Sequence, residues 1–277
     1  MKKILVFGAR GMFGHVAVRY LSGLGKYEVM PCVRGDAADG EMSVNVTDFA
    51  RVRDVLLAER PDYVVNGVGL LVRDCSCRTD LAILVNAYFP HLLARIGEEI
   101  GFKLIHISTD CVFSGKTGGY REDSFRDGDL PYDRTKAMGE IVDARNLTIR
   151  TSIIGPELKE NGTGLFHWFM HQHGTVRGFT KAFWSGVTTL ELAKVVDAAI
   201  DQGVTGLYQL AMPAISKFDL LNLFKEIWQK DDVEIVPFAD FSCDKSLVCT
   251  RTDFVYRLPS SHRAMLEELS AWMRSQH

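Results

Sequence analysis

The sequence lacks the long apolar run that a membrane-spanning helix needs, since no stretch approaches about 18 apolar residues. It also lacks a surplus of positive charge: 32 lysine and arginine residues are balanced by 35 aspartate and glutamate residues, for a formal net charge of −3. A nucleic-acid-binding protein usually shows a basic surplus or a basic stripe. We therefore expect neither a membrane nor a nucleic acid as a partner.

A disulfide framework and a metal motif are lacking as well. The six cysteines have no regular spacing, and Cys75 and Cys77 are separated by one residue where redox and zinc motifs have two. His167 and His171 share a helix face, but no acidic partner lies at the usual offset, so we expect no metal. The apolar start breaks at Gly8, too early for a signal peptide. These features favour reduced thiols and a cytoplasmic location.

The first half of the chain alternates short apolar runs with segments of helical period. Strands are expected at residues 4–7, 28–33, 63–66, 103–108 and 147–152, and helices at residues 13–24, 49–58, 81–100 and 132–144. Such alternation is typical of parallel strands joined by crossover helices. The fold class expected is therefore α/β, with a Rossmann-type doubly wound parallel sheet.

Past Gly155 the pattern changes. Strands are expected at residues 176–179 and 206–210, and helices at 189–201 (capped by Thr188), 218–229 (introduced by Ser216) and 261–274. We expect residues 1–154 to form an NAD(P)-binding Rossmann domain, and residues 155–277 to form mainly a small C-terminal substrate-binding lobe. Segments near residues 180–205 are candidates to return to the first domain.

A glycine-rich turn follows the first strand. Its glycines are Gly8, Gly11 and Gly14, and the residues between them include Arg10, Met12 and Phe13. Backbone without a Cβ can approach a pyrophosphate closely, and the N-terminus of the following helix offers N–H donors and a positive dipole. The alternative is a tight strand-to-helix turn without a ligand, and the position near the start of a strand–turn–helix unit favours dinucleotide binding.

The end of the second strand indicates which dinucleotide is bound. An NAD site usually has an acidic side chain there, whereas this chain has Arg34, which Arg10 could join. Two guanidinium groups suit a 2′-phosphate, so we expect NADPH in preference to NADH. Asp36, an acidic residue close by in the sequence, points the other way. Asn45 and Val46 would then contact the adenine.

A tyrosine and a lysine lie one helical turn apart, at Tyr132 and Lys136. An ammonium group beside a phenol lowers the pKa of the phenol, which could then exchange a proton with a carbonyl oxygen. The strand before them ends in Ser108 and Thr109, and either hydroxyl could bind the developing alkoxide. Spacing alone would also fit an exposed helix face without function.

Three motifs together carry a resemblance to a known family. They are Ser-Thr-Asp-x-Val-Phe-x-Gly from Ser108, Gly-Tyr-Arg-Glu-Asp from Gly119, and Tyr-x3-Lys-x2-Gly-Glu from Tyr132. With them the chain resembles the extended short-chain dehydrogenase/reductases, and the dTDP-4-dehydrorhamnose reductase family in particular. The resemblance runs over nearly the whole chain and is strongest between residues 104 and 152.

The resemblance implies NADPH-dependent reduction of the C4 ketone of a nucleotide-linked 4-keto-6-deoxy sugar, in deoxysugar or surface polysaccharide biosynthesis. It implies that Thr109 is the catalytic hydroxyl, Tyr132 the general acid, and Lys136 its partner and the anchor of the cofactor ribose. Further cofactor contacts expected are Asn86, Ser108, Tyr132 itself, Thr151, Ser152 and Ile153, with Gly67 and Val68 at a turn that departs from the more usual alanine-rich one.

Substrate contacts are expected from the end of the fourth strand and from the second lobe. The candidates are Asp110, Val112, Phe113, Arg177, Lys181, Trp184 and Ser185. Cations suit a nucleotide diphosphate and an aromatic face can stack on a base or sugar, while core packing is an equal alternative for Trp184.

Two alternative functions remain open. An epimerase of the same superfamily would keep the same residues, and a non-catalytic NADP-binding regulatory subunit would use the same fold. A sugar dehydratase is disfavoured, because Cys111 stands after Asp110 where similar dehydratases carry a glutamate. Symmetric homodimers are the commonest oligomers of soluble proteins, and on that ground alone we expect a homodimer.

Overall fold

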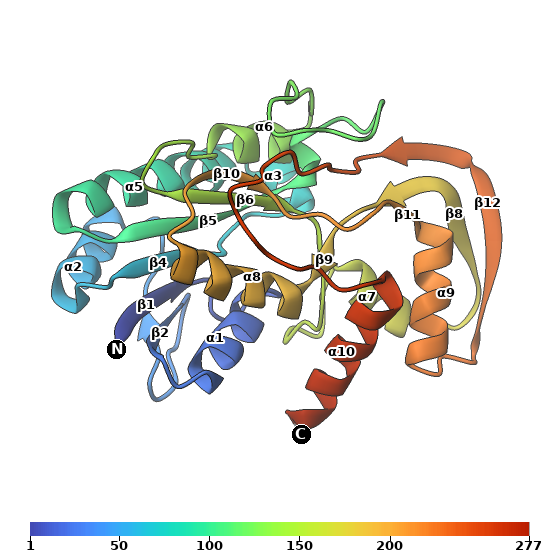
Figure 1. Ribbon diagram of the computed structural model, residues 1–277, viewed down its shortest axis with the longest axis horizontal. Helices are drawn as coiled ribbons and strands as arrows, with labels where there is room; N and C mark the ends of the chain where they lie inside the picture. The colour runs from blue at the N-terminus through green and yellow to red at the C-terminus, as the bar shows by residue number, and fades with distance from the viewer. Residues whose placement is uncertain (277) are drawn as a thin grey trace.

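A seven-stranded sheet lies at the centre of the computed structural model, which describes residues 1–276 (Figure 1). The strand order is β10-β6-β5-β4-β1-β2-β3, and every neighbouring pair is parallel. The strands are β1 (Lys2–Phe7), β2 (Tyr27–Val33), β3 (Met42–Ser43), β4 (Tyr63–Asn66), β5 (Lys103–Thr109), β6 (Leu147–Thr151) and β10 (Gly206–Gln209). The expected Rossmann-type doubly wound sheet is therefore confirmed.

The apolar run of β1 is divided between the two faces of the sheet. Ile4 and Val6 join the core that contains α1 (Gly14–Gly23) and α8 (Thr189–Gln202), whereas Leu5 and Phe7 join the core that contains α2 (Phe49–Glu59) and α5 (Phe89–Ile100). These helices cover opposite faces of the sheet in Figure 1. A parallel strand buried on both faces is apolar throughout, which explains why the run shows no alternation.

The helix expected at residues 81–100 is interrupted. It consists of α4 (Thr79–Ala82), a π-helical segment (Ile83–Tyr88) and α5, and a further short helix, α3 (Val72–Cys77), precedes it. Pro90 has no N–H to donate to the carbonyl of Asn86 four residues earlier. That carbonyl lies against Gly139, where a Cβ would overlap it. The interruption thus follows from the proline and from a close approach that only glycine allows.

The helix that carries Tyr132 is shorter than expected. It is α6 (Pro131–Met138), and it ends six residues before Ala144, the expected last residue. The chain turns inward at Gly139, so that the next side chain, Glu140, is buried and pairs with Arg150. This buried pair forms with a residue of β6, and the sequence pattern does not show it.

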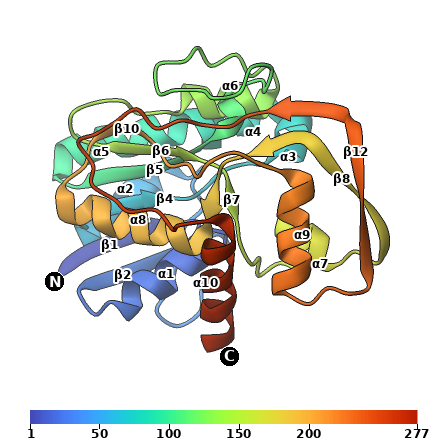
Figure 2. The ribbon, with the colours of Figure 1, turned by 45° about the vertical axis from the view of Figure 1, so that its right-hand side comes forward.

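A smaller three-stranded sheet, of order β11-β8-β12, lies at one end of the molecule with α9 (Figure 2). Its elements are β8 (Gly174–Trp184), β11 (Ile215–Ser216), α9 (Lys217–Ile227) and β12 (Val233–Asp244), with α7 (Leu165–Met170) before it and α10 (His262–Ser275) after it. The strand β8 is longer than expected, and β12 was not predicted. Before β8 lies β7 (Ile153–Ile154), which pairs with β9 (Val187–Thr188) in a separate two-stranded sheet. Between β9 and β11 the chain forms α8 and then β10, which joins the large sheet beside β6.

Helix starts agree with the sequence. The hydroxyl of Thr188 accepts a hydrogen bond from the Glu191 N–H at 3.1 Å, and that of Ser216 accepts one from the Asp219 N–H at 3.0 Å. Both are N-caps of the expected kind. Among residues 1–276, no helix is both long enough and apolar enough to cross a bilayer.

Candidate active site

The glycine turn forms a tight cradle between β1 and α1. Gly8 has φ +81°, and its carbonyl accepts a hydrogen bond from the N–H of Gly11 at 2.8 Å. A Cβ at Gly14 would overlap the Gly8 carbonyl, whereas a Cβ at Gly11 would meet only that oxygen, at 3.1 Å. The space above Gly11 is therefore open, at the N-terminus of a ten-residue helix. This backbone fits the pyrophosphate of a dinucleotide.

The glycine turn packs against Phe13 and against the residues that follow β4. Phe13 is buried in the core, and its ring lies against Gly67, where a Cβ would be 3.2 Å from the ring. A Cβ at Gly8 would lie 3.2 Å from the Gly67 backbone and from the Val68 side chain. The glycine at position 67 thus lets the end of β4 approach the turn. Met12 is half-buried beside Gly164, while the side chain of Phe13 is a core residue.

The two arginines expected at a 2′-phosphate have different surroundings. Arg34 is exposed directly after β2, but Arg10 forms a two-pronged ion pair with Glu41, with Nε 3.1 Å from Oε1. Asn45 and Val46 follow β3 at the same edge, with Asn45 exposed and accepting from Thr47. Sequence reasoning missed Glu41 because it sought an acidic group at the end of β2, not in the next segment.

The expected catalytic side chains converge at the carboxyl end of β5. Thr109 is its last residue, and its hydroxyl oxygen accepts from the Cys111 N–H at 3.1 Å. Tyr132 lies in the first turn of α6, so that its phenol is close enough to Thr109 for hydrogen bonding to that hydroxyl to lower its pKa. Burial nevertheless raises the pKa of Tyr132 above its ordinary value, and Cys111 and Asp110 act in the same direction.

The side chain of Lys136, one helical turn after Tyr132, is hydrogen-bonded to the backbone of β5. Its Nζ donates to the Ile107 carbonyl at 2.8 Å, and the side chain is 4% exposed. Burial lowers the pKa of Lys136 to about 8, although the nearby Glu140 raises it. The Lys136 ammonium is therefore held against β5 with a pKa below its ordinary value.

The hydroxyls of Ser108 and Thr109 have different neighbours. The Ser108 hydroxyl is buried and donates to Glu140 Oε1 at 2.7 Å. It thus belongs to a buried charged network beneath the site and not to the alkoxide-binding position that was expected as an alternative. Of the two, Thr109 is the hydroxyl that lies beside Tyr132.

Asn86 is completely buried in the π-helical segment. Its Oδ1 accepts from the Leu70 N–H at 2.8 Å, and its Nδ2 donates to the Leu70 carbonyl at 3.1 Å and to Thr135 Oγ1 at 3.3 Å. The amide thus holds the segment after β4 against α6. The expected contact of Asn86 with the cofactor stays a prediction. Thr151 is buried at the end of β6, with Ser152 and Ile153 half-buried after it.

Several expected substrate contacts are core residues. Val112 and Phe113 are fully buried, and Phe113 stacks on Tyr120 with ring centroids 4.2 Å apart. Trp184 is 5% exposed within the main core, and Ser185 accepts from the Leu247 N–H at 2.8 Å. These four side chains are packed in the core, as aromatic and small residues at a strand end often are, and their contact with a substrate stays a prediction.

Charged candidates do face solvent. Arg177 and Lys181 are exposed on β8, with the Arg177 guanidinium 4.7 Å from the Phe238 ring centroid, and Asp110 is half-buried beside Thr109. Lys245, which the sequence did not indicate, follows β12 and lies against Gly115. Although its burial acts the other way, the nearby Cys111, Asp133 and Asp110 raise the pKa of Lys245. It was missed because β12 itself was not expected.

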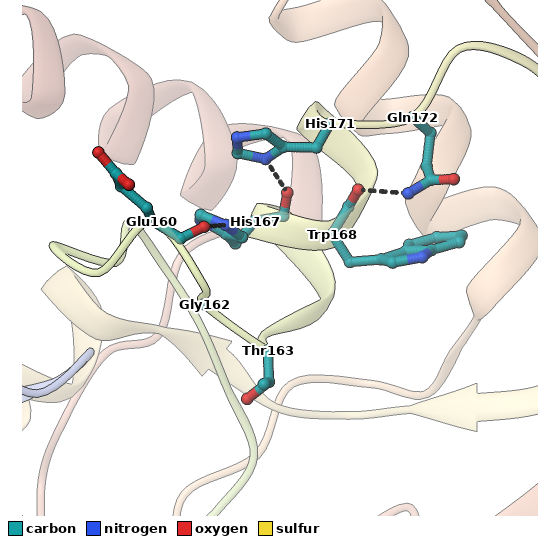
Figure 3. Close-up of a pocket in the computed structure, with 7 residues that line it drawn as sticks. All are labelled: Glu160, Gly162, Thr163, His167, Trp168, His171 and Gln172. Carbon is teal, nitrogen blue, oxygen red and sulfur yellow. Dashed lines mark hydrogen bonds between the residues drawn. The ribbon is translucent and has the colours of Figure 1, made fainter.

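The histidines of α7 line a separate cavity of about 530 Å³ (Figure 3). The rings of His167 and His171 lie 4.3 Å apart, and their ring nitrogens are within hydrogen-bond distance of the carbonyls of Glu160 and His167. Within residues 1–276, no group of three or more His, Cys, Asp and Glu side chains is placed to hold a metal ion.

The amino-acid sequence of this chain matches the model of a known protein family and is similar to individual proteins of known name. The model of the RmlD substrate binding domain matches residues 1–245. The spore coat polysaccharide biosynthesis protein SpsK of Bacillus subtilis is 36% identical over 142 residues, which are 50% of this chain and 47% of that protein. A dTDP-4-dehydrorhamnose reductase of Streptomyces griseus is 35% identical over 142 residues, 49% of this chain and 43% of that protein. The chain thus matches slightly less than half the length of these relatives.

Solved structures match over more of the chain. A hypothetical dTDP-4-dehydrorhamnose reductase from Sulfolobus tokodaii has a TM-score of 0.76 and 28% identity, covering 89% of this chain and 92% of that one. A dTDP-4-dehydrorhamnose reductase from Clostridium acetobutylicum has a TM-score of 0.79 and shares the fold at 23% identity, covering 98% of this chain and 99% of that one. With its glycine turn, its Tyr132–Lys136 helix and a family match over residues 1–245, the chain belongs to the RmlD substrate binding domain family.

Proposed function

We propose that the protein is an NADPH-dependent reductase of the C4 ketone of a nucleotide-linked 4-keto-6-deoxy sugar. The observation that carries this proposal is that Tyr132 lies beside Thr109, and Lys136 bonds to Ile107, near the carboxyl end of β5, two strands along the sheet from the glycine turn. Ligands of such sheets bind at this edge. The names of two relatives support the same chemistry, the reductase of Streptomyces griseus and a dTDP-4-keto-6-deoxy-D-glucose reductase of Streptomyces niveus, 33% identical over 138 residues.

The cofactor would be held by the backbone of the glycine turn and by side chains at the ends of β2 and β5. NADPH supplies the hydride when it is bound. The N–H groups around Gly11 would bind the pyrophosphate, Arg34 would face the 2′-phosphate, and Lys136 would bind the nicotinamide ribose from its place beside Ile107.

Tyr132 is the proton donor in this proposal. Because burial raises its pKa, the phenol keeps its proton at neutral pH, which is the form that a general acid needs. The hydroxyl of Thr109 binds the same carbonyl oxygen and stabilises the charge that develops on it. The cations of Arg177, Lys181 and Lys245 would bind the diphosphate of the substrate.

A second candidate is a non-catalytic dinucleotide-binding subunit. One observation favours it: a methionine adenosyltransferase 2 subunit beta of Xenopus laevis is 27% identical over 140 residues, 50% of this chain and 42% of that protein. An epimerase of the same superfamily is the third candidate, since it would use the same three side chains.

The test is a turnover assay with NADPH and a panel of dTDP-, UDP- and GDP-linked 4-keto-6-deoxy sugars, with product analysis by NMR. Consumption of NADPH with reduction at C4 supports the reductase. A change of sugar configuration without net NADPH consumption indicates the epimerase. Tight NADPH binding without any turnover would leave the subunit as the better proposal.

We also propose that the protein acts as a homodimer in the cytoplasm. All six cysteines are unpaired, as expected for a reducing compartment. Exposed apolar side chains lie at the start of α3 and on the π-helical segment, and a second copy would cover them: Leu71, Val72, Ile83, Leu84 and Tyr88. Light scattering of the protein and of an Ile83→Asp variant tests this: a wild-type monomer contradicts the dimer, and loss of a wild-type dimer in the variant locates the interface.

A further inference from the structure

Arg10 and Glu41 form an ion pair at the edge of the sheet where the adenosine of a dinucleotide would lie. The guanidinium and the carboxylate make two contacts: Nε of Arg10 lies 3.1 Å from Oε1 of Glu41, and Nη2 of Arg10 pairs with Oε2. Oε2 of Glu41 also accepts from the Ala38 N–H at 2.8 Å. Glu41 is the less exposed partner, at 18% against 45%. The Arg10 side chain is thus held by an acidic group that is itself anchored to backbone.

The backbone places this pair at the tip of β2. Ala9 donates its N–H to the Cys32 carbonyl at 3.1 Å, which ties the glycine turn to the last residues of that strand. Glu41 directly precedes β3, whose Met42 pairs with Cys32. In a Rossmann sheet, the adenosine ribose lies at this strand end, and an acidic side chain there binds its hydroxyls. Here the acidic group comes from the segment before β3.

Arg34 is the other cation at this place, and within residues 1–276 it has no ion-pair partner closer than 4 Å. A 2′-phosphate would therefore meet Arg34 directly, but it could gain Arg10 only by displacing Glu41. The displaced carboxylate would then repel the phosphate. A free 2′-hydroxyl, in contrast, could donate to Glu41 while the ion pair stays intact.

We propose that Glu41 determines the choice between the two nicotinamide dinucleotides, by competing with the 2′-phosphate for Arg10. This inference rests on the proposed function, because it assumes that a dinucleotide binds here. It implies that the wild-type chain binds NAD⁺ within about tenfold of its affinity for NADP⁺, in spite of the two arginines, and that removal of the carboxylate creates a strong preference for NADP⁺.

The experiment measures the dissociation constants of NADP⁺ and NAD⁺ by titration calorimetry, for the wild type and for Glu41→Gln. The glutamine keeps the size of the side chain and a carbonyl for the Ala38 N–H, but it removes the charge. We expect NADP⁺ to bind about tenfold more tightly and NAD⁺ severalfold more weakly in the variant. Glu99→Gln is the matched control, since Glu99 forms a similar surface pair with Arg53 at 2.6 Å on α2 and α5, and neither constant should change in it.

Arg10→Gln gives a second, independent measurement. This substitution removes the cation and leaves the Glu41 carboxylate without its partner. The affinity for NADP⁺ should therefore fall more than tenfold, and the affinity for NAD⁺ should fall by less. If the wild type and Glu41→Gln bind both dinucleotides with the same ratio of affinities, the inference is wrong, although the proposed function is untouched. If neither dinucleotide binds to the wild type, the proposed function fails with it.

Discussion

The carboxylate of Glu140 and the guanidinium of Arg150 form a two-pronged ion pair inside the protein. Arg150 Nε lies 2.9 Å from Oε1 and Nη2 lies 2.7 Å from Oε2, and the side chains are 0% and 1% exposed. Ser108 and Arg126 donate to the same carboxylate, and Arg150 also donates to Gln209. The pair thus joins the end of α6 to β5, β6 and β10, directly below Lys136 and Thr109.

Removing the charge of Glu140 should be strongly destabilising. Glu140→Gln leaves the buried Arg150 guanidinium without its anion, and breaking a buried pair in this way costs about 3–5 kcal/mol. Chemical denaturation at neutral pH measures the loss. Glu28→Gln is the control, because its pair with Lys3 is exposed and 3.6 Å long, and it should change almost nothing. Equal stability of the two variants would contradict this account.

The same carboxylate gives a pH dependence. Although burial acts the other way, the bonds from Arg150 and Ser108 hold the pKa of Glu140 below its usual range. A depressed pKa contributes stability above the unfolded pKa of about 4.3 and loses it as the pH falls through the folded value. The difference in unfolding free energy between wild type and Glu140→Gln should therefore shrink as the pH is lowered below about 4. A constant difference down to acid unfolding would mean that the charge is not the cause.

Tyr132→Phe should separate binding from proton transfer. Phenylalanine keeps the ring but has no proton to give, so kcat should fall by about 10²–10⁴-fold. The dissociation constant of NADPH should stay within a factor of about two, because the phenol acts on the substrate carbonyl and not on the pyrophosphate. Tyr88→Phe, at a tyrosine 41% exposed on the surface, is the control. An unchanged kcat in Tyr132→Phe would assign the proton to another group.

Lys136 should make stability rise with pH. Its folded pKa of about 8 lies below the unfolded value of 10.5, so between these values the unfolded chain holds a proton that the folded protein has lost. The unfolding free energy of the wild type, compared with that of Lys136→Met, should increase by about 2 kcal/mol between pH 7 and about pH 9.5. Tyrosines and cysteines titrate in the same pH range, but they contribute equally to the unfolding free energies of both proteins. Their contributions therefore cancel in the difference. Parallel curves would show that Lys136 keeps an ordinary pKa.

Local chemistry in the sequence predicted much of this structure. The caps at Thr188 and Ser216 and the strand from Tyr63 to Asn66 were expected at the observed residues, because each depends on neighbours in the chain. The parallel, doubly wound character of the sheet followed from the alternation of strands and helices, whereas the strand order came from the structure. The place of Thr109 beside Tyr132 followed from the rule that parallel strands present their carboxyl ends at one edge.

Features that depend on distant contacts were missed. The end of α6 at Gly139 requires the carbonyl of Asn86, more than fifty residues earlier, and the burial of Ser108 requires Glu140. Glu41 contacts Arg10 only because the pairing of β3 with β2 brings the two residues together. In each of these cases the residue type was visible in the sequence, but its partner was set by tertiary packing.

The glycine turn allows folding and binding to be tested separately. A methyl group at Gly14 would overlap the Gly8 carbonyl and the Ala9 backbone, so Gly14→Ala should lower the unfolding free energy by about 3 kcal/mol or more. Gly11 differs, since its Cβ would meet only one oxygen, at 3.1 Å, and would otherwise project into the open space of the cradle. Gly11→Ala should therefore stay within about 1 kcal/mol of the wild type while its affinity for NADP⁺ falls at least about tenfold.

Denaturation and titration calorimetry on the same preparations check both of these expectations, with Gly23→Ala as the control. Gly23 ends α1, and a Cβ there meets nothing within 4 Å, so the affinity should not change and the unfolding free energy should rise by no more than about 1 kcal/mol. A normal affinity in a well-folded Gly11→Ala would place the pyrophosphate away from this turn. Because a dinucleotide in any other position would leave Tyr132 and Lys136 without a hydride donor beside them, that result would also remove the basis for assigning them to catalysis.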